Sequence, residues 1–154
     1  MINYQTGDLL QSPAEALVNT VNTVGVMGKG IALQFREAFP HNYKKYLDAC
    51  KKKELQPGVL LSVWDNNLQS GQKLIVNFPT KVHWRNPSQY EYIEKGLDAL
   101  RDLLLEQAIK SIAIPALGSG NGGLDWQKVK PLIEAKLKDL DVDIQVYEPT
   151  AHIR

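Results

Sequence analysis

The sequence is short of the features that mark several protein classes. It has one cysteine, Cys50, in 154 residues, so no internal disulfide can form. Its cysteine and histidine residues lack the spacing of zinc ligands, so we expect no structural metal. The charges nearly cancel, with 18 Lys and Arg against 17 Asp and Glu. This balance argues against a protein that coats nucleic acid by bulk charge, although it allows a local basic patch.

Long apolar runs are missing too. The longest nearly uncharged stretch, residues 16–28, is interrupted by Asn19 and Asn22 and is far shorter than the roughly 20 apolar residues that cross a bilayer. The first residues show no basic segment followed by an apolar one, so no secretory signal is visible. We therefore expect no membrane contact and a cytoplasmic location. With 11 glycines and 8 prolines the composition is that of a globular chain, which excludes disordered and collagen-like classes.

The rest of the sequence alternates between short runs of strand length and longer segments with helical spacing of apolar residues. Short runs rich in β-branched residues predict six strands, at 2–5, 16–19, 59–64, 73–78, 111–115 and 143–147. Four helices are predicted between them: two from 30 to 53 that separate near Phe39-Pro40, one that starts near Ser88 as its N-cap, and one over 125–140 capped by Asp125. The alternation predicts an α/β fold with helices on both faces of one sheet. No linker divides residues 1–154, so we expect a single domain.

Two glycine-rich loops each follow a predicted strand and precede a predicted helix. The first, Gly25 to Gly30, has too short a spacing before its Gly-Lys pair for a triphosphate-binding P-loop and lacks the following Ser or Thr. The second, Gly118 to Gly123, matches the G-x-G-x-x-G of dinucleotide-binding folds, and Glu148 falls near the end of the next strand. Too little chain follows for the rest of such a fold. Either loop could also be only a turn.

The two loops share a physical property that suits one kind of ligand. Glycines let backbone amides turn toward an anion, and the helix that follows adds free N–H groups and a positive dipole end. Two such loops at the carboxyl ends of a sheet predict a ligand whose diphosphate is held from both sides. Asp8, after the first strand, is placed to accept a hydrogen bond from an exocyclic amine such as that of adenine, or to form a surface turn or a helix cap.

Several segments together resemble the macrodomains, a family of ADP-ribose-binding modules. These segments are 7–10, 16–22, 25–30 and 114–125. Asn77 to Lys81, with the run 18–32, further resembles the branch that removes ADP-ribose, in particular from DNA. The resemblance implies three α/β/α layers around a mixed six-stranded sheet, no metal and no cofactor. It also implies that the chain is the N-terminal module of a longer protein.

The resemblance also implies roles for individual residues. Asp8 and the backbone of Leu9 would read the adenine, and Asn22 would face the distal ribose. Amides would line the diphosphate from two sides: Gly25, Val26, Met27, Gly28 and Gly30 on one, and Gly118, Ser119, Gly120, Asn121, Gly122, Gly123 and Leu124 on the other. Lys81 matches the catalytic lysine of this branch, and Asp125 matches the acidic partner of its protein-deacylating relatives.

The Lys81 amine is expected on a loop at the end of a strand, where functional side chains concentrate. Cleavage at the distal anomeric carbon of ADP-ribose develops positive charge that an amine could attack or stabilise. Attack needs the neutral amine: burial or a nearby cation would lower the pKa of Lys81, whereas a diphosphate would raise it. Covalent attack assisted by Asp125 and a purely electrostatic role both stay open. Asp125 could also serve only as a helix cap.

Cations and an aromatic ring alternate directly after Lys81, in His83, Trp84 and Arg85. Such a segment can bind phosphates and stack a base on the indole, as proteins that bind single strands do. The alternative is a loop whose tryptophan packs on its own domain. Residues 51–53 are three lysines that end a predicted helix, and we expect a solvated terminus there rather than a DNA patch.

Three functions follow from the resemblance. The first is a hydrolase that removes ADP-ribose from thymidine bases of DNA and reverses a toxin's modification. Its partners would be ADP-ribosylated single-stranded DNA, ADP-ribose and the cognate ADP-ribosyltransferase toxin. The second is hydrolysis of ADP-ribosyl esters on protein Glu and Asp, and the third is a reader that binds ADP-ribose without catalysis and needs no reactive Lys81. We assign no role to Cys50, His41 or His152.

Overall fold

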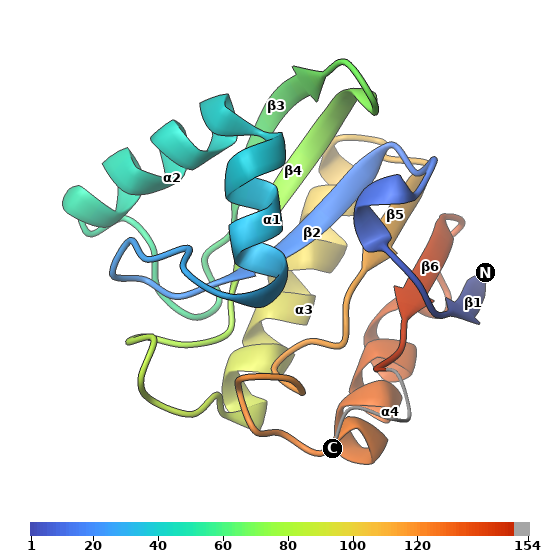
Figure 1. The fold of residues 1–154 in the computed structure, drawn as a ribbon. Coiled ribbons are helices and arrows are strands. Elements are labelled where there is room, and N and C mark those ends of the chain that lie inside the picture. The colour runs from blue at the N-terminus through green and yellow to red at the C-terminus, as the bar shows by residue number, and fades with distance from the viewer. Residues whose placement is uncertain (150–154) are drawn as a thin grey trace.

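A computed structural model describes residues 1–149, so His152 lies outside the described part. Its centre is one six-stranded sheet in the order β1-β6-β5-β2-β4-β3, with helices packed around it (Figure 1). The strands are β1 (Ile2–Gln5), β2 (Ala16–Val21), β3 (Leu61–Asn67), β4 (Gly71–Pro79), β5 (Ser111–Ile114) and β6 (Asp143–Tyr147). The helices are α1 (Gly30–Ala38), α2 (Pro40–Lys51), α3 (Tyr90–Glu106) and α4 (Trp126–Leu137), with one 3₁₀ turn, η1 (Leu9–Gln11).

Because most strands run parallel, the loops that follow them lie at one edge of the sheet. All neighbouring strands run parallel except β3, which is antiparallel to β4. In the register of β2 with β4, Ala16 stands beside Leu74 and Val21 beside Pro79, so these two strands end together. The segments that follow β1, β2, β4, β5 and β6 therefore emerge from the same edge of the sheet.

Alternation along the strands builds a core on each face. On β2, Ala16 and Val18 join the apolar cluster under α3 and α4, whereas Leu17 joins the cluster under α1. Successive side chains of a strand point to opposite faces, so two helical layers are needed to cover the sheet. The predicted α/β/α fold with a mixed six-stranded sheet is confirmed. No helix within residues 1–149 is both long enough and apolar enough to cross a membrane.

Several predicted element boundaries differ from the structure. β2 and β4 are longer than the strands predicted at 16–19 and 73–78, and β5 ends one residue before the predicted 115. The strand predicted at 59–64 lies at Leu61–Asn67, because its polar second half pairs with the start of β4 in a hairpin. The helix predicted over 125–140 has the predicted cap, Asp125, but ends at Leu137. Ser88 is not the cap of α3: Gln89 holds that position, and the Ser88 side chain is buried instead.

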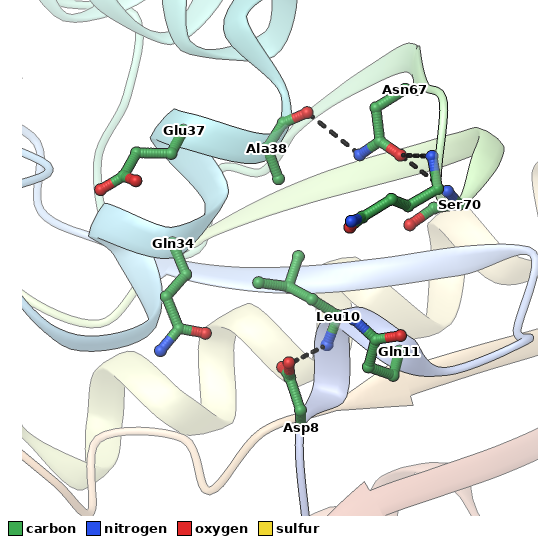
Figure 2. A pocket seen from close by; sticks show the side chains of 9 residues that line it. Asp8, Leu10, Gln11, Gln34, Glu37, Ala38, Asn67 and Ser70 are labelled. Atoms are coloured by element: carbon green, nitrogen blue, oxygen red, sulfur yellow. Dashed lines mark hydrogen bonds between the residues drawn. The ribbon is translucent and has the colours of Figure 1, made fainter.

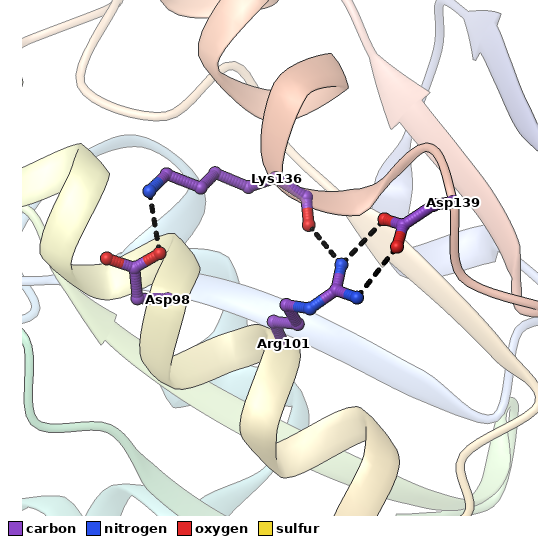
Figure 3. A network of polar contacts seen from close by, with 4 residues as sticks. All are labelled: Asp98, Arg101, Lys136 and Asp139. Atoms are coloured by element: carbon purple, nitrogen blue, oxygen red, sulfur yellow. Dashed lines mark hydrogen bonds and ion pairs between the residues drawn. The ribbon is translucent and has the colours of Figure 1, made fainter.

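Charged side chains on the outer surface join α3 to α4 (Figure 3). The Arg101 guanidinium donates to both carboxylate oxygens of Asp139, at 2.7 and 2.8 Å, and to the carbonyl of Lys136. The Lys136 amine in turn pairs with Asp98 at 2.8 Å. The two carboxylate side chains are 60–61% exposed and the two basic ones 33%, so water screens these pairs and each adds little to stability.

Gly96 provides a test of how tightly α3 packs on the sheet. A Cβ at this position would stand 2.2 Å from Cζ of the fully buried Phe78 ring in β4. Helix propensity favours alanine over glycine by about 1 kcal/mol, but overpacking a rigid core costs about 1–3 kcal/mol and often more at so short a contact. We expect Gly96→Ala to lower the free energy of unfolding in urea by about 1–3 kcal/mol, with the exposed position Glu94→Ala within about 0.5 kcal/mol of wild type. A Gly96→Ala protein as stable as wild type would show that the ring has room to move.

Candidate functional site

Three loops meet at the carboxyl edge of the sheet: 22–29 after β2, 80–89 after β4 and 115–125 after β5 (Figure 1). The amide and the hydroxyl of Thr23 both donate to the carbonyl of Val82, each at 3.0 Å. The amide of Ser88 donates to the carbonyl of Gly122 at 3.0 Å. A Cβ on Gly30 would lie 3.5 Å from Nδ2 of Asn121. The two glycine loops therefore face each other closely, with the Lys81 loop bonded to both segments.

Asn22 holds the first glycine loop in shape. Its side-chain oxygen accepts hydrogen bonds from the amides of Val24 and Val26, and its amide nitrogen donates to the carbonyl of Val26 at 2.7 Å. The Tyr46 hydroxyl donates to the same side-chain oxygen at 2.9 Å, and burial raises the pKa of Tyr46 so that it stays a donor. Asn22, which the sequence placed at the ribose, thus has one N–H left for a ligand. Sequence reasoning missed Tyr46, whose helical position gives no signal of this contact.

Some backbone amides of the first glycine loop already have a hydrogen-bond partner in the protein, and others do not. The amide of Val26 is taken by Asn22, whereas those of Met27 and Gly28 have no hydrogen-bond partner within the described residues. Gly30 opens α1 at φ +56°, a conformation that favours glycine, and the preceding Lys29 offers no side-chain cap. The first N–H groups of α1 are therefore uncapped and carry the positive end of the helix dipole.

The second glycine loop is closed by its own turns. The amides of Ser119, Gly123 and Leu124 donate to the carbonyls of Ala116, Gly120 and Gly118. Gly118 has φ +68°, and a Cβ there would come within 2.8 Å of the Leu124 side chain. Within residues 1–149 the amides of Gly120, Asn121 and Gly122 have no partner. Seven amides of this loop were predicted to meet a ligand. Those of Ser119, Gly123 and Leu124 are occupied, whereas the amide of Gly118 has no partner among the described residues either, so four are left for a ligand.

Lys81 is half-buried on the loop after β4, as its place in the sequence predicted. Its amine donates to the carbonyl of Trp84 at 3.2 Å. Burial, and secondly the positive charge of Lys29, hold the pKa of Lys81 below that of a free lysine. The neutral amine is thus more abundant than on an ordinary surface lysine. Sequence reasoning treated Lys29 only as part of the first glycine loop, because its approach to Lys81 depends on the fold.

Asp125 is exposed and caps α4. Its Oδ1 accepts from the amide of Gln127 at 3.0 Å, and its own amide donates to the hydroxyl of Tyr90 at 3.1 Å. Neither a hydrogen bond nor an ion pair joins Asp125 to Lys81 anywhere in the described chain. The capping role is therefore visible, and the predicted role in chemistry stays a prediction.

The segment after Lys81 presents a mixed basic and apolar surface. The His83 and Trp84 rings stack at a centroid distance of 5.4 Å, and the Arg85 guanidinium lies 4.6 Å from the indole centroid. Trp84 is 38% exposed, so part of its indole surface is open to solvent while the rest is covered by the protein. Val82 on the same loop, and Val24 and Val26 on the loop bonded to it, are 41–45% exposed. These four apolar side chains, 24, 26, 82 and 84, form what we call the apolar rim.

An open hollow of about 540 Å³ lies at the β1 side of this edge, where Asp8 and Leu9 meet Ile31, Gln34 and Tyr147. Leu9 is buried, so only its backbone could touch a ligand. Oδ1 of Asp8 accepts from the amide of Leu10, and Oδ2 has no partner within the described residues (Figure 2). A second hollow of about 310 Å³ shares Asp8 and Gln34 and extends toward Asn67. Across residues 1–149, no three His, Cys, Asp or Glu side chains are placed to hold a metal ion.

The arrangement of these loops has known counterparts. The sequence profile of the Macro domain matches residues 18–133 of the chain. The chain belongs to the Macro domain family. The expectation drawn from the sequence motifs is thereby confirmed at the level of the family.

Relatives of this macrodomain are named for an activity or a bound ligand. It is 51% identical over 150 residues to a DNA ADP-ribosyl glycohydrolase of Thermus aquaticus, covering 97% of this chain but only 41% of that relative's length. The macrodomain of Mycobacterium tuberculosis DarG superposes with a TM-score of 0.93 at 50% identity, over 97% of this chain and 99% of that one. Thermosipho africanus DarTG in complex with ADP-ribose superposes with a TM-score of 0.89 at 39% identity, over 96% of this chain and 41% of that one.

The charge of Lys29 gives a test of the electrostatics at Lys81. Removal of a nearby cation stabilises the protonated amine, so Lys29→Ala is expected to raise the pKa of Lys81. The measurement is an NMR titration of ¹³C-methylated lysines, with the Lys81 signal assigned by its loss in Lys81→Arg. Lys44→Ala, an exposed position on α2, is the matched control and should leave the titration unchanged. An unchanged or lower pKa in Lys29→Ala would contradict the assigned influence of Lys29.

Proposed function

We propose that this macrodomain is a hydrolase that removes ADP-ribose from thymidine bases of DNA and so reverses the modification made by an ADP-ribosyltransferase toxin. The observation that carries the proposal is the meeting of two loops with unpaired amides beside a half-buried lysine of lowered pKa. The names of the relatives support DNA as the substrate and ADP-ribose as the ligand. Such a role places the protein in the cytoplasm with the DNA.

The geometry supports one orientation for ADP-ribose. Asp8 Oδ2 is unpaired at the hollow beside β1 and suits the exocyclic amine of adenine, which is a hydrogen-bond donor. The diphosphate then reaches the amides of Gly28 and Gly120 and the uncapped end of α1, which together favour negative charge. The distal ribose lies toward Lys81, on the far side of the glycine loops from Asp8.

Lys81 carries the proposed chemistry. Its neutral amine attacks the anomeric carbon of the distal ribose, a carbon–nitrogen bond forms, and the N-glycosidic bond to thymine breaks. The electron pair leaves with the base, which takes up a proton. Water then displaces the lysine, which returns to its amine, and ADP-ribose is released. In this covalent route Asp125 assists proton transfer or the release of the adduct. The alternative is an electrostatic role, in which the ammonium form of Lys81, favoured by the bound diphosphate, orients the substrate.

The substrate and the lysine can be tested together. The chain is incubated with a single-stranded oligonucleotide that carries an ADP-ribosylated thymidine and, separately, with a peptide ADP-ribosylated on glutamate. We expect release of ADP-ribose from the oligonucleotide, and a fall of at least about 100-fold in turnover for Lys81→Ala, because a reacting group of the site is lost. Lys44→Ala is the control, and calorimetry should show that Lys81→Ala still binds ADP-ribose.

Each other result of this experiment contradicts part of the proposal. Release from the peptide alone would make the protein an ester hydrolase. Binding of ADP-ribose without release from either substrate would make it a reader. Unchanged turnover by Lys81→Ala would leave the reaction but remove Lys81 from it.

The apolar rim is proposed to contact the DNA around the modified nucleotide. Trp84 offers an exposed indole for stacking, and Arg85 beside it offers a cation for phosphate. Stacking of a base on an aromatic side chain is worth about 1–3 kcal/mol, so Trp84→Ala should lower kcat/KM on the oligonucleotide by about 5- to 100-fold. Release from ADP-ribosylated thymidine itself, which has no neighbouring bases, should change little. Leu105→Ala, an apolar position exposed on α3, is the control. An equal loss on both substrates would indicate damage to the site rather than a lost DNA contact.

A further inference from the structure

Ser88 is a buried serine whose hydroxyl makes no hydrogen bond within the described residues. It is 5% exposed, and its Oγ is one of two buried side-chain atoms without a hydrogen-bond partner among residues 1–149. An unpaired hydroxyl in a protein interior is unfavourable, and alanine in its place would avoid that cost. Nor does it cap α3, the role that its sequence position predicted.

The position of Ser88 is where the lysine loop touches the second glycine loop. Its amide donates to the carbonyl of Gly122, and its Cβ would lie 3.3 Å from a Cβ on Gly118. A Cβ on Gly122 would stand 2.3 Å from Ser88 Oγ and 2.4 Å from the carbonyl oxygen of Gly118. The hydroxyl and that carbonyl therefore border the same small space, which only a glycine at 122 leaves open.

Burial keeps the Ser88 hydroxyl from direct contact with a ligand, because its Oγ is closed off from solvent. The Gly118 carbonyl, which borders the same space, is an acceptor beside it. This carbonyl already accepts from the amide of Leu124, but a carbonyl oxygen has a second lone pair. The unpaired amides of this turn are those of Gly118 and residues 120–122, so an anion that binds them contacts the same turn that Ser88 borders.

We propose that Ser88 is a positioning residue whose hydroxyl donates to the Gly118 carbonyl when a diphosphate occupies the second glycine loop. That hydrogen bond adds a second link between the loop carrying Lys81 and the loop that holds the diphosphate, besides the one from the Ser88 amide to the Gly122 carbonyl. Through this hydrogen bond, the position of the Lys81 amine depends on whether a diphosphate is bound. The inference rests on the proposed function insofar as it assigns Lys81 to the reaction, but its binding component concerns ADP-ribose alone.

The test compares Ser88→Ala with wild type in the whole chain. Readouts are the melting temperature without ligand, the Kd for ADP-ribose by calorimetry, and kcat on the ADP-ribosylated oligonucleotide. Without ligand, Ser88→Ala should melt no lower than wild type, because it loses only an unpaired hydroxyl. Its Kd should rise and its kcat should fall, each about 3- to 10-fold, as the loss of one ordinary hydrogen bond predicts. Ser88→Cys, which keeps a weak donor, should lie between the two.

Ser62→Ala on β3, remote from the glycine loops, is the control and should change neither binding nor turnover. A lower melting temperature with unchanged Kd and kcat would make Ser88 a packing residue and overturn the proposal. If the melting temperature, Kd and kcat are all unchanged, the hydroxyl has no role in binding or turnover, and the proposal is overturned as well. If wild type binds ADP-ribose but releases none from DNA, the proposed reaction fails, whereas the Kd of Ser88→Ala still decides whether the hydroxyl responds to the diphosphate.

Discussion

The site depends on parallel pairing in the sheet. Because β1, β6, β5, β2 and β4 all point the same way, their following loops meet at one edge, although residues 8, 22, 81 and 118 are far apart in the chain. The two apolar clusters stabilise this pairing from both faces. Met27 and Leu117 anchor the two glycine loops in apolar clusters, and short-range hydrogen bonds hold the rest of these loops. A change that loosens the contact between β2 and β4 would therefore act on the site without touching a loop residue.

Polar groups around the site fall into two kinds. Some are used within the protein, such as the side-chain oxygen of Asn22, which accepts from Tyr46 and from two amides of the first glycine loop and so gives this loop one shape before any ligand arrives. Others are left unpaired, such as the amides of Gly28 and Gly120. Two lysines, 29 and 81, also stand close enough that one lowers the pKa of the other. Unpaired donors and crowded positive charge both favour an anion, so the site is prepared for a phosphate group at the cost of some stability.

Much of the fold could be predicted from the sequence, because strand and helix periods are local. The break between α1 and α2 at Pro40 and the cap at Asp125 are local as well, and both were found. The motifs located both glycine loops and Lys81. What escaped prediction depends on contacts between distant segments: Tyr46 reaches Asn22 from α2, and Lys29 influences Lys81 across two loops. Ser88 was misread since a serine before a helix suits a cap, and only the fold shows Gly122 against it.

The two hydrogen bonds from Thr23 to the Val82 carbonyl have a mechanical consequence. They fasten the first glycine loop to the lysine loop, so a displacement of one loop is transmitted to the other. Strain introduced at either loop is therefore shared by both, and neither acts as an independent flap.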